Sequence, residues 1–361
     1  MDPRDKRILI LKPSSLGDII HTLPVVHALK RCAPGCSIGW VVQETYAAIP
    51  ESDPAVDRVY PITISSTSDP AAGRLAYWRA LRDTVAALSR LRGQFRSRPY
   101  DIVLDLHASF RSGLIGMANP GGTRIGFADA REMNTLFQHR RLPVPPTLVH
   151  ALDKNLLFCT SLGCPPEKED FYLCSGEQAD SRVAGFLERR GVSPDDSLVY
   201  IQPAARWATK FWLRERWAEF ADRLLGRRGT RVVFGGGRGD KTSIDAIVEV
   251  MRLRPVVAAG GLNLAETASL LKRSALYIGL DSGPMHMAAM AGVPVVALFG
   301  PTHPERVGPY GVEQVIVRAP GLDCLGCRKR RCDHMECMRG ISVDMVHDAA
   351  LRLLPPVPGE E

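Results

Sequence analysis

The 361-residue sequence lacks the features that mark several large classes of protein. It has no run of about eighteen or more apolar residues, so no segment is predicted to span a bilayer as a helix. It also has no internal repeat and no long low-complexity tract. The sequence also lacks the usual patterns of nucleic-acid-binding proteins, namely an aromatic RNA-binding signature, a C₂H₂ zinc-finger pattern and a basic helix followed by heptads. Nucleic acid is therefore not expected as a partner.

A signal peptide is not expected either. The first residues place charges on both sides of a short apolar run and have no small-residue cleavage site, so they are predicted to form a first strand. We therefore expect a cytoplasmic protein. Nine cysteines are an odd number, which makes a complete disulfide framework improbable in that compartment.

The composition is that of a globular protein, with 45% hydrophobic and 24% charged residues. At about 150 residues per domain, the length suggests two domains. The net charge of +7 favours an anionic partner, such as an acidic lipid or a phosphorylated sugar. A basic surface without a specific partner would have the same charge.

Strand-like apolar runs alternate with helix-period segments in two series, and this alternation predicts parallel sheets covered by helices on both faces. The runs are RILILK (7–12), SIGWVV (37–42) and DIVLDL (101–106), then SLVYIQ (197–202), RVVFGGG (231–237), ALYIGL (275–280) and VPVVALFG (293–300).

The two series predict two Rossmann-like, doubly wound α/β domains with a cleft between them. A loop-rich stretch at about 163–195 separates them. We place the first domain at 1–180, the second at 181–342, and a C-terminal helix and tail at 343–361. Ligands in such sheets bind beyond the carboxyl ends of strands, so motifs that follow strands are the candidates for function.

The first motif, PSSLGDIIH (13–21), follows the first strand and opens the first helix. Ser15 and Gly17 belong to a tight turn with exposed backbone N–H groups, and Asp18 falls in the first helical turn. Asp18 is a candidate catalytic carboxylate. An ordinary helix-start acid, favoured by the helix dipole, would stand at the same place.

The second motif, GLDSGPMH (279–286), again joins a strand to a helix. Ser282 is a good helix cap, Gly283 lets a ligand approach the backbone, and the helix amino terminus favours a diphosphate. His286 adds a side chain one turn into the helix. A plain Asp-Ser-Gly helix start is the structural alternative.

Two further segments follow strands of the second series. ARWATKFW (205–212) contains Lys210, a candidate phosphate ligand. GGGRGD (235–240) is a flexible turn that ends at Asp240 and does not have the spacing of a dinucleotide fingerprint.

Taken together, these motifs resemble the bacterial lipopolysaccharide heptosyltransferases, members of glycosyltransferase family 9, and most closely those that add the first heptose. The resemblance runs from residue 7 to about 312. It is carried by KPSSLGDIIHTLPVVHALK, ARWATKFW and GLDSGPMHMAAMAGVPVVALFGPTHPERVGPYG, and it continues in WVVQETYAAIP, DLHASFRSGLIG, GTRIGFADARE and HALDKN.

The resemblance implies a GT-B architecture and an inverting transfer of L-glycero-D-manno-heptose from ADP-heptose to Kdo-lipid A, the lipopolysaccharide inner-core acceptor. Asp18 would be the general base, and no cofactor would be needed for catalysis. Donor-binding residues would be Lys210, Asp240, Asp281, Ser282, Gly283 and His286. Acceptor-binding residues would be Ser15, Gly17, Arg111 and Arg124. The enzyme would work as a peripheral protein at the inner face of the cytoplasmic membrane.

The cysteine-rich end departs from this resemblance. Cys324, Cys327, Cys332 and Cys337, with His334 between the last two, look like ligands of a structural Zn²⁺ ion or iron–sulfur cluster. The later intervals are short for a usual zinc ribbon, and free or loosely paired thiols are the alternative.

Other functions remain open from the sequence. The same donor could serve a second heptosyltransferase or a protein heptosyltransferase. A nucleotide-sugar epimerase and a non-catalytic binding module would use similar Rossmann-like domains, although the presence of Asp18, Lys210 and His286 argues against the module.

Overall fold

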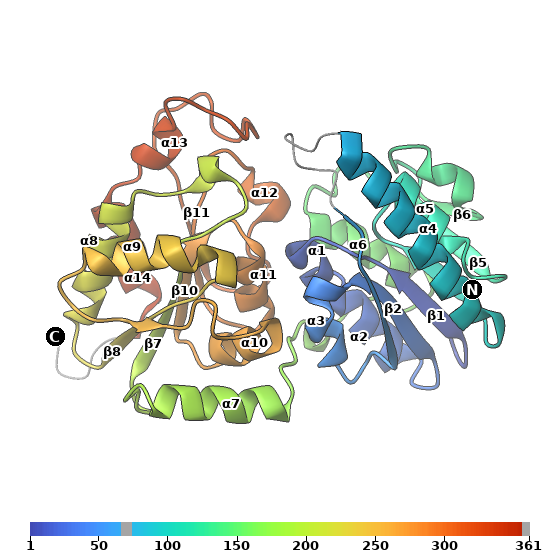
Figure 1. The fold of residues 1–361 in the computed structure, drawn as a ribbon, viewed down its shortest axis with the longest axis horizontal. Coiled ribbons are helices and arrows are strands. Elements are labelled where there is room, and N and C mark those ends of the chain that lie inside the picture. The colour runs from blue at the N-terminus through green and yellow to red at the C-terminus, as the bar shows by residue number, and fades with distance from the viewer. Residues whose placement is uncertain (66–73, 356–361) are drawn as a thin grey trace. The chain divides into compact units, whose positions relative to one another are not determined.

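The computed structural model describes residues 1–65 and 74–355, and the chain divides into two compact units, residues 1–171 and 172–361. Each unit is a parallel sheet with helices packed on it (Figure 1). The sequence-based boundary lies at residue 180, and the last part of the predicted tail, residues 356–361, falls outside the described residues.

The first unit contains a six-stranded sheet in the order β3-β2-β1-β4-β5-β6, in which every neighbouring pair is parallel. Its strands are β1 (Arg7–Leu11), β2 (Ser37–Gln43), β3 (Arg58–Ile62), β4 (Ile102–Asp105), β5 (Thr123–Phe127) and β6 (Arg140–Leu142). The predicted α/β class with a parallel sheet is confirmed for this unit.

Helices cover this sheet because its strands are apolar on both faces. Leu9, Val41 and Val103 pack with Leu91 and Phe95 of the long helix α4 (Arg74–Arg96) in one core cluster. The helices of the unit are α1 (Leu16–Ile20), α2 (Leu23–Cys32), α3 (Ala48–Glu51), α4 (Arg74–Arg96), α5 (Phe110–Gly116) and α6 (Ala151–Ser161).

The second unit repeats the plan, with the strand order β12-β11-β10-β7-β8-β9 and all neighbours parallel. Its strands are β7 (Ser197–Gln202), β8 (Thr230–Phe234), β9 (Val256–Val257), β10 (Leu276–Leu280), β11 (Val295–Leu298) and β12 (Gln314–Val317). The two sheets with flanking helices confirm the expected pair of doubly wound units.

The main core of the second unit joins its central strands to α8 (Arg214–Leu225) and α14 (Val343–Leu353). Trp212 and Trp217 meet edge to face with ring centroids 4.9 Å apart, and both belong to this core. The helices are α7 (Glu177–Glu188), α8 (Arg214–Leu225), α9 (Lys241–Glu249), α10 (Leu264–Lys272), α11 (Gly283–Met290), α12 (Pro304–Val307), α13 (Glu336–Arg339) and α14 (Val343–Leu353).

Helix α7 corrects one sequence-based prediction. The stretch 163–195 was expected to be rich in loops, yet Glu177–Glu188 is helical. Ala179, Val183 and Leu187 recur at a spacing of four residues and are buried, and α7 packs against α10. Turn residues lie on both sides of this segment, and only three residues of the helix are buried, so the periodic pattern that predicts a helix is weak here.

A single covalent cross-link is present among the described residues. Cys32, the last residue of α2, forms a disulfide with Cys164, with Cα atoms 5.6 Å apart. The other seven cysteines are outside this disulfide. In the described part of the chain, no helix combines the length and apolar character needed to cross a bilayer.

Candidate functional site

Three of the four predicted acceptor residues, Ser15, Gly17 and Arg111, follow the two strands between which the strand order of the first sheet changes direction. Chain crossovers run outward from β1 on one side and from β4 on the other, so the loops that leave these two neighbouring strands diverge. Such a switch point is the usual ligand site of an open parallel sheet. The loop after β1 leads into α1, whose first turn contains Asp18. The loop after β4 carries His107 and leads into α5, which contains Arg111.

Asp18 lies in the first turn of α1, and the turn before it holds its carboxylate. Ser15 donates to Asp18 Oδ2 from its backbone N–H (3.0 Å) and its hydroxyl (2.7 Å), and Lys12 Nζ lies 3.3 Å from Oδ1. Burial favours the neutral acid, but the charge of Lys12 and the Ser15 hydrogen bonds outweigh it, so the pKa of Asp18 lies well below the usual carboxyl range. Asp18 is therefore ionised at neutral pH.

Basic side chains surround this carboxylate. Lys12 is buried and donates to the carbonyl of Leu106 (2.7 Å), which brings the loops after β1 and β4 together. His107 interacts electrostatically with Lys12, Asp18 and Arg111. Burial and the charge of Lys12 lower the pKa of His107 to about 4, so its ring is neutral at pH 7.

Sequence reasoning missed Lys12 and His107, although both lie in segments that carried the family resemblance. The signal was available: Lys12 directly follows β1, and His107 is the second residue after β4. Only the parallel pairing of Leu11 with Asp105 places them at one edge of the sheet.

The buried carboxylate of Asp105, the last residue of β4, stabilises the loop that follows this strand; the residue is 1% exposed. Burial raises the pKa of Asp105, and hydrogen bonds oppose that rise. The donors are the side chains of Ser112 (3.0 Å), Asn134 (2.7 Å) and Gln138 (3.1 Å) and the backbone N–H groups of His107 (3.1 Å) and Ala108 (3.0 Å). This network fixes the loop that presents His107.

The other predicted acceptor residues take different positions. Ser15 is the amino-terminal cap residue of α1, and Gly17 lies within that helix. Arg111 is part of α5. Arg124 is the second residue of β5, and its guanidinium donates to the carbonyl of Phe137 (2.6 Å) and lies 2.8 Å from His139 Nε2. These contacts favour a structural role for Arg124, and its part in acceptor binding stays a prediction.

The second sheet has its own switch point, between β7 and β10. Lys210 follows β7 and Asp281 directly follows β10. Lys210 Nζ donates to the Asp281 carboxylate (2.7 Å) and backbone carbonyl (3.0 Å), and it lies 4.9 Å from the centre of the Trp207 ring. The pair is largely buried, so Asp281 holds the ammonium group at the carboxyl edge of the sheet.

Helix α11 begins beside this ion pair. Ser282 is its cap residue with extended backbone, and Gly283 and Pro284 are its first helical residues. His286 is buried in its first turn. The amino-terminal N–H groups of this eight-residue helix and the ammonium of Lys210 make this edge suitable for a diphosphate.

Asp240 stands on the loop after β8, the strand next to β7. Its carboxylate accepts from the Gly237 backbone N–H (2.9 Å), which closes the turn before α9. Gly235 has to be small, because a Cβ atom there would overlap the hydroxyl of Tyr200. The carboxylate is partly exposed, and its part in donor binding stays a prediction.

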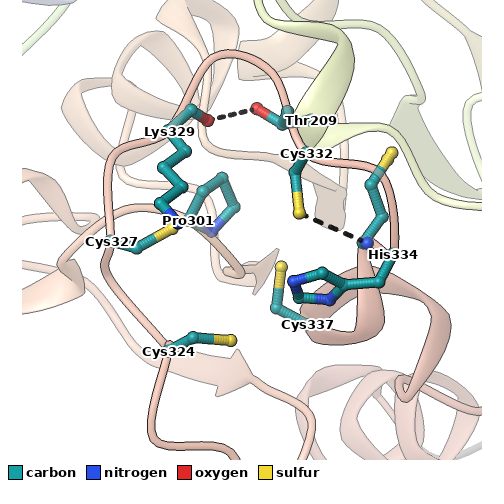
Figure 2. Close-up of a pocket in the computed structure, with 9 residues that line it drawn as sticks. Thr209, Pro301, Cys324, Cys327, Lys329, Cys332, His334 and Cys337 are labelled. Carbon is teal, nitrogen blue, oxygen red and sulfur yellow. Dashed lines mark hydrogen bonds between the residues drawn. The ribbon is translucent and has the colours of Figure 1, made fainter.

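The predicted metal ligands line one pocket of the second unit, together with Thr209, Pro301 and His334 (Figure 2). Burial raises the pKa of the Cys337 thiol, and the nearby charges of Cys324, Cys327 and Cys332 raise it further. Within residues 1–65 and 74–355, no three His, Cys, Asp or Glu side chains are already arranged around a common metal position.

Comparison with known proteins agrees with this architecture. Residues 88–338 match glycosyltransferase family 9 (heptosyltransferase). The chain is 31% identical to lipopolysaccharide heptosyltransferase 1 of Pseudomonas aeruginosa, over 91% of this chain and 88% of that protein.

Two solved structures extend the likeness to the whole fold. A family 9 glycosyltransferase from Veillonella parvula has a TM-score of 0.83 at 25% identity and covers 98% of both chains. An E. coli heptosyltransferase solved with ADP has a TM-score of 0.73 at 25% identity, covering 96% of this chain and 99% of that one. The GT-B architecture expected from the sequence is therefore confirmed. This chain belongs to glycosyltransferase family 9, the heptosyltransferase family, and it is a glycosyltransferase.

Proposed function

We propose that the protein transfers a heptose from ADP-heptose to the Kdo sugar of lipid A, as a heptosyltransferase I of lipopolysaccharide core synthesis. Full-length similarity to an enzyme named lipopolysaccharide heptosyltransferase 1 supports the activity, and the E. coli structure bound to ADP supports the nucleotide. Family membership favours glycosyl transfer over the epimerase and binding-module alternatives.

The donor's diphosphate would bind at the carboxyl edge of the second sheet. Lys210 supplies a positive charge, and Ser282 and Gly283 supply backbone N–H groups at the start of α11. Asp281 alone would repel a phosphate, but its pairing with Lys210 neutralises it and fixes the ammonium group. His286 and Asp240 would complete the donor site. These groups stabilise the charge of departing ADP without a cofactor.

The observation that carries the acceptor half of the proposal is the ionised Asp18 carboxylate, which Lys12 and Ser15 hold beside the neutral His107 ring. Arg111, whose charge acts on His107, supplies a positive group for an acceptor that carries acidic Kdo sugars and lipid phosphates. Ser15 and Gly17 would contribute to acceptor binding beside Asp18.

The chemistry follows from these two sites. The acceptor hydroxyl oxygen attacks the anomeric carbon of heptose as the bond from that carbon to the ADP oxygen breaks, and ADP leaves with the electron pair. Asp18 takes the hydroxyl proton. Attack from the face opposite ADP inverts the anomeric configuration. A carboxylate with a lowered pKa is a weak base, so the contribution of Asp18 comes mainly from position.

Contact with the inner membrane face is part of the proposal, because the acceptor is a lipid. Helix α4 contains six arginines and one acidic residue. Four large apolar side chains near its start are exposed, and such residues beside arginines suit the interface of an anionic bilayer. They are Tyr77, Trp78, Leu81 and Val85. Flotation with anionic but not with neutral vesicles is the expected result, and equal flotation with both would contradict this contact.

The test of function is ADP release from ADP-heptose by purified protein, with and without Kdo-lipid A. Release should require the acceptor, and Asp18→Asn should lower kcat/KM by roughly 10²- to 10⁴-fold, the usual contribution of a general base. Asp57→Asn is a matched control, because Asp57 is also a first-unit carboxylate paired with a lysine, 2.9 Å from Lys30 Nζ.

Three results would contradict the proposal. Unchanged turnover in Asp18→Asn would remove Asp18 from its role. Transfer only to an acceptor that already carries heptose would assign the enzyme to a later core step. A retained anomeric configuration, determined by NMR of the product, would exclude the single-displacement mechanism.

A further inference from the structure

The pocket in Figure 2 gathers four thiols from one short segment, residues 324–337. None of the four is in a disulfide. Cys324 and Cys327 are exposed, Cys332 is partly buried and Cys337 is buried. Four thiols that line one pocket are a potential set of soft metal ligands.

Between β12 and α13, residues 318–335 form no helix or strand. Ala319, Leu322 and Leu325 pack on the core of the second unit. Hydrogen bonds tie the segment to neighbouring loops, from Gly326 N–H to Gly300 (3.0 Å), from Arg328 N–H to Pro301 (2.7 Å) and from the Thr209 hydroxyl to Lys329 (2.9 Å). Short irregular segments without a core of their own are commonly stabilised by a structural metal.

The spacing and the surrounding charge both suit a metal. Cys324 and Cys327 stand three residues apart in a turn closed by a Cys327 N–H to Cys324 carbonyl bond (3.3 Å), and a backbone N–H donates to the sulfur of Cys332 (3.5 Å). Four thiolates around a divalent ion carry a net charge of −2. The run Arg328, Lys329, Arg330, Arg331 lies between the second and third cysteines and offsets that charge.

We propose that Cys324, Cys327, Cys332 and Cys337 bind one structural metal ion, Zn²⁺ or iron, in tetrahedral thiolate coordination. Thiolates are soft ligands that select these ions over Mg²⁺ or Ca²⁺. The thiols lose their protons on binding, and the two exposed cysteines move in toward Cys337 to complete the set.

The metal would stabilise residues 324–337, which contact the loop that carries Trp207 and Lys210. Thr209, which lines the pocket, directly precedes Lys210. The guanidinium of Arg330 lies 4.8 Å from the centre of the Trp207 ring, and Lys210 contacts the same ring. Ordering residues 324–337 therefore supports the loop that carries the proposed phosphate ligand.

Metal content tests the site without any turnover assay, so its failure is distinguishable from failure of the proposed function. The full-length protein, stripped with a chelator under reducing conditions and then supplied with Zn²⁺ or Fe²⁺, should retain about one ion per chain. Cys332→Ser should retain almost none, whereas Cys174→Ser, a thiol of the same unit outside the pocket, should retain as much as the parent protein.

Limited trypsin digestion gives a second readout that does not depend on a variant. Metal removal should speed cleavage at residues 328–331 by at least about tenfold, because these exposed residues would lose the thiolate–metal bonds on both sides of them. Retention of less than about a tenth of an ion per chain, or equal retention by Cys332→Ser, would overturn the proposal. Acid-labile sulfide, or a Cys324–Cys327 disulfide in the reduced preparation, would also overturn it.

Discussion

His107 should make the first unit lose stability as the pH falls. Its pKa in the folded protein is lowered to about 4 from the ordinary value of 6.5, first by burial and then by the charge of Lys12. In the unfolded chain the ring binds a proton near pH 6.5, whereas the native ring stays neutral until about pH 4. The unfolded state therefore takes up the proton first, and stability falls over this window as acid is added.

The magnitude follows from the width of the window. The difference of about 2.5 units between 6.5 and about 4, at about 1.36 kcal/mol per unit, gives roughly 3 kcal/mol in total. About 2 kcal/mol of this is lost between pH 7 and pH 5. His107→Gln keeps a polar side chain of similar size that does not titrate, so the variant should lose about 2 kcal/mol less than the parent protein over the same interval.

Urea unfolding at pH 7, 6 and 5, followed by pulsed hydrogen exchange and mass spectrometry of β4 peptides, measures the first unit separately from the second. This separation matters because a chain with two units need not unfold in one step. Equal pH dependence in the parent protein and His107→Gln would refute the reasoning. It would show that the native ring takes up a proton as readily as the unfolded one.

Three further predictions concern neighbouring groups. Lys12 and Ser15 hold the pKa of Asp18 well below the usual carboxyl value, so kcat should show no loss from protonation of Asp18 between pH 8 and pH 5. A fall in kcat at the acid end of that range that disappears in Asp18→Asn would contradict this prediction. Lys210→Met should weaken ADP binding, measured by calorimetry, by roughly tenfold to a hundredfold, because a hydrogen bond to a charged group contributes about that much. Lys241→Met removes only an exposed ion pair with Asp245, so it should leave ADP binding unchanged. Asp105→Ala should lower the free energy of unfolding of the first unit by about 3 kcal/mol or more, because it leaves buried hydrogen-bond donors unpaired. A loss below about 1 kcal/mol would show that water accepts hydrogen bonds from these donors in the variant.

The sequence by itself determined the architecture and the positions of the motifs. Apolar runs and helix-period segments alternate because parallel strands buried on both faces need helices between them, and β1, β2, β4, β7, β8, β10 and β11 lie where those runs predicted. The motifs at Asp18, Lys210 and Ser282 follow strands, as ligand-binding loops of such sheets do.

Local pattern was too weak for the elements away from the centre of each sheet. The outer strands β3, β5, β6, β9 and β12 were not singled out, and α7 was taken for loop. These elements are stabilised by what they pack against, so their own residues carry little periodic signal.

Only the tertiary structure decided which groups meet. His107 is 89 residues from Asp18 in the chain, and Lys210 is 71 from Asp281, yet each pair interacts because the parallel pairing of β1 with β4 and of β7 with β10 brings their loops to one sheet edge. Arg124 donates to the Phe137 carbonyl near the start of its strand, a contact that its motif did not indicate, and its part in acceptor binding stays a prediction. Strand order is a long-range property, so the neutral His107 and the fixed ammonium of Lys210 could be derived only from the folded chain, whereas Lys12 and Ser15, which lower the pKa of Asp18, are its near neighbours in the sequence.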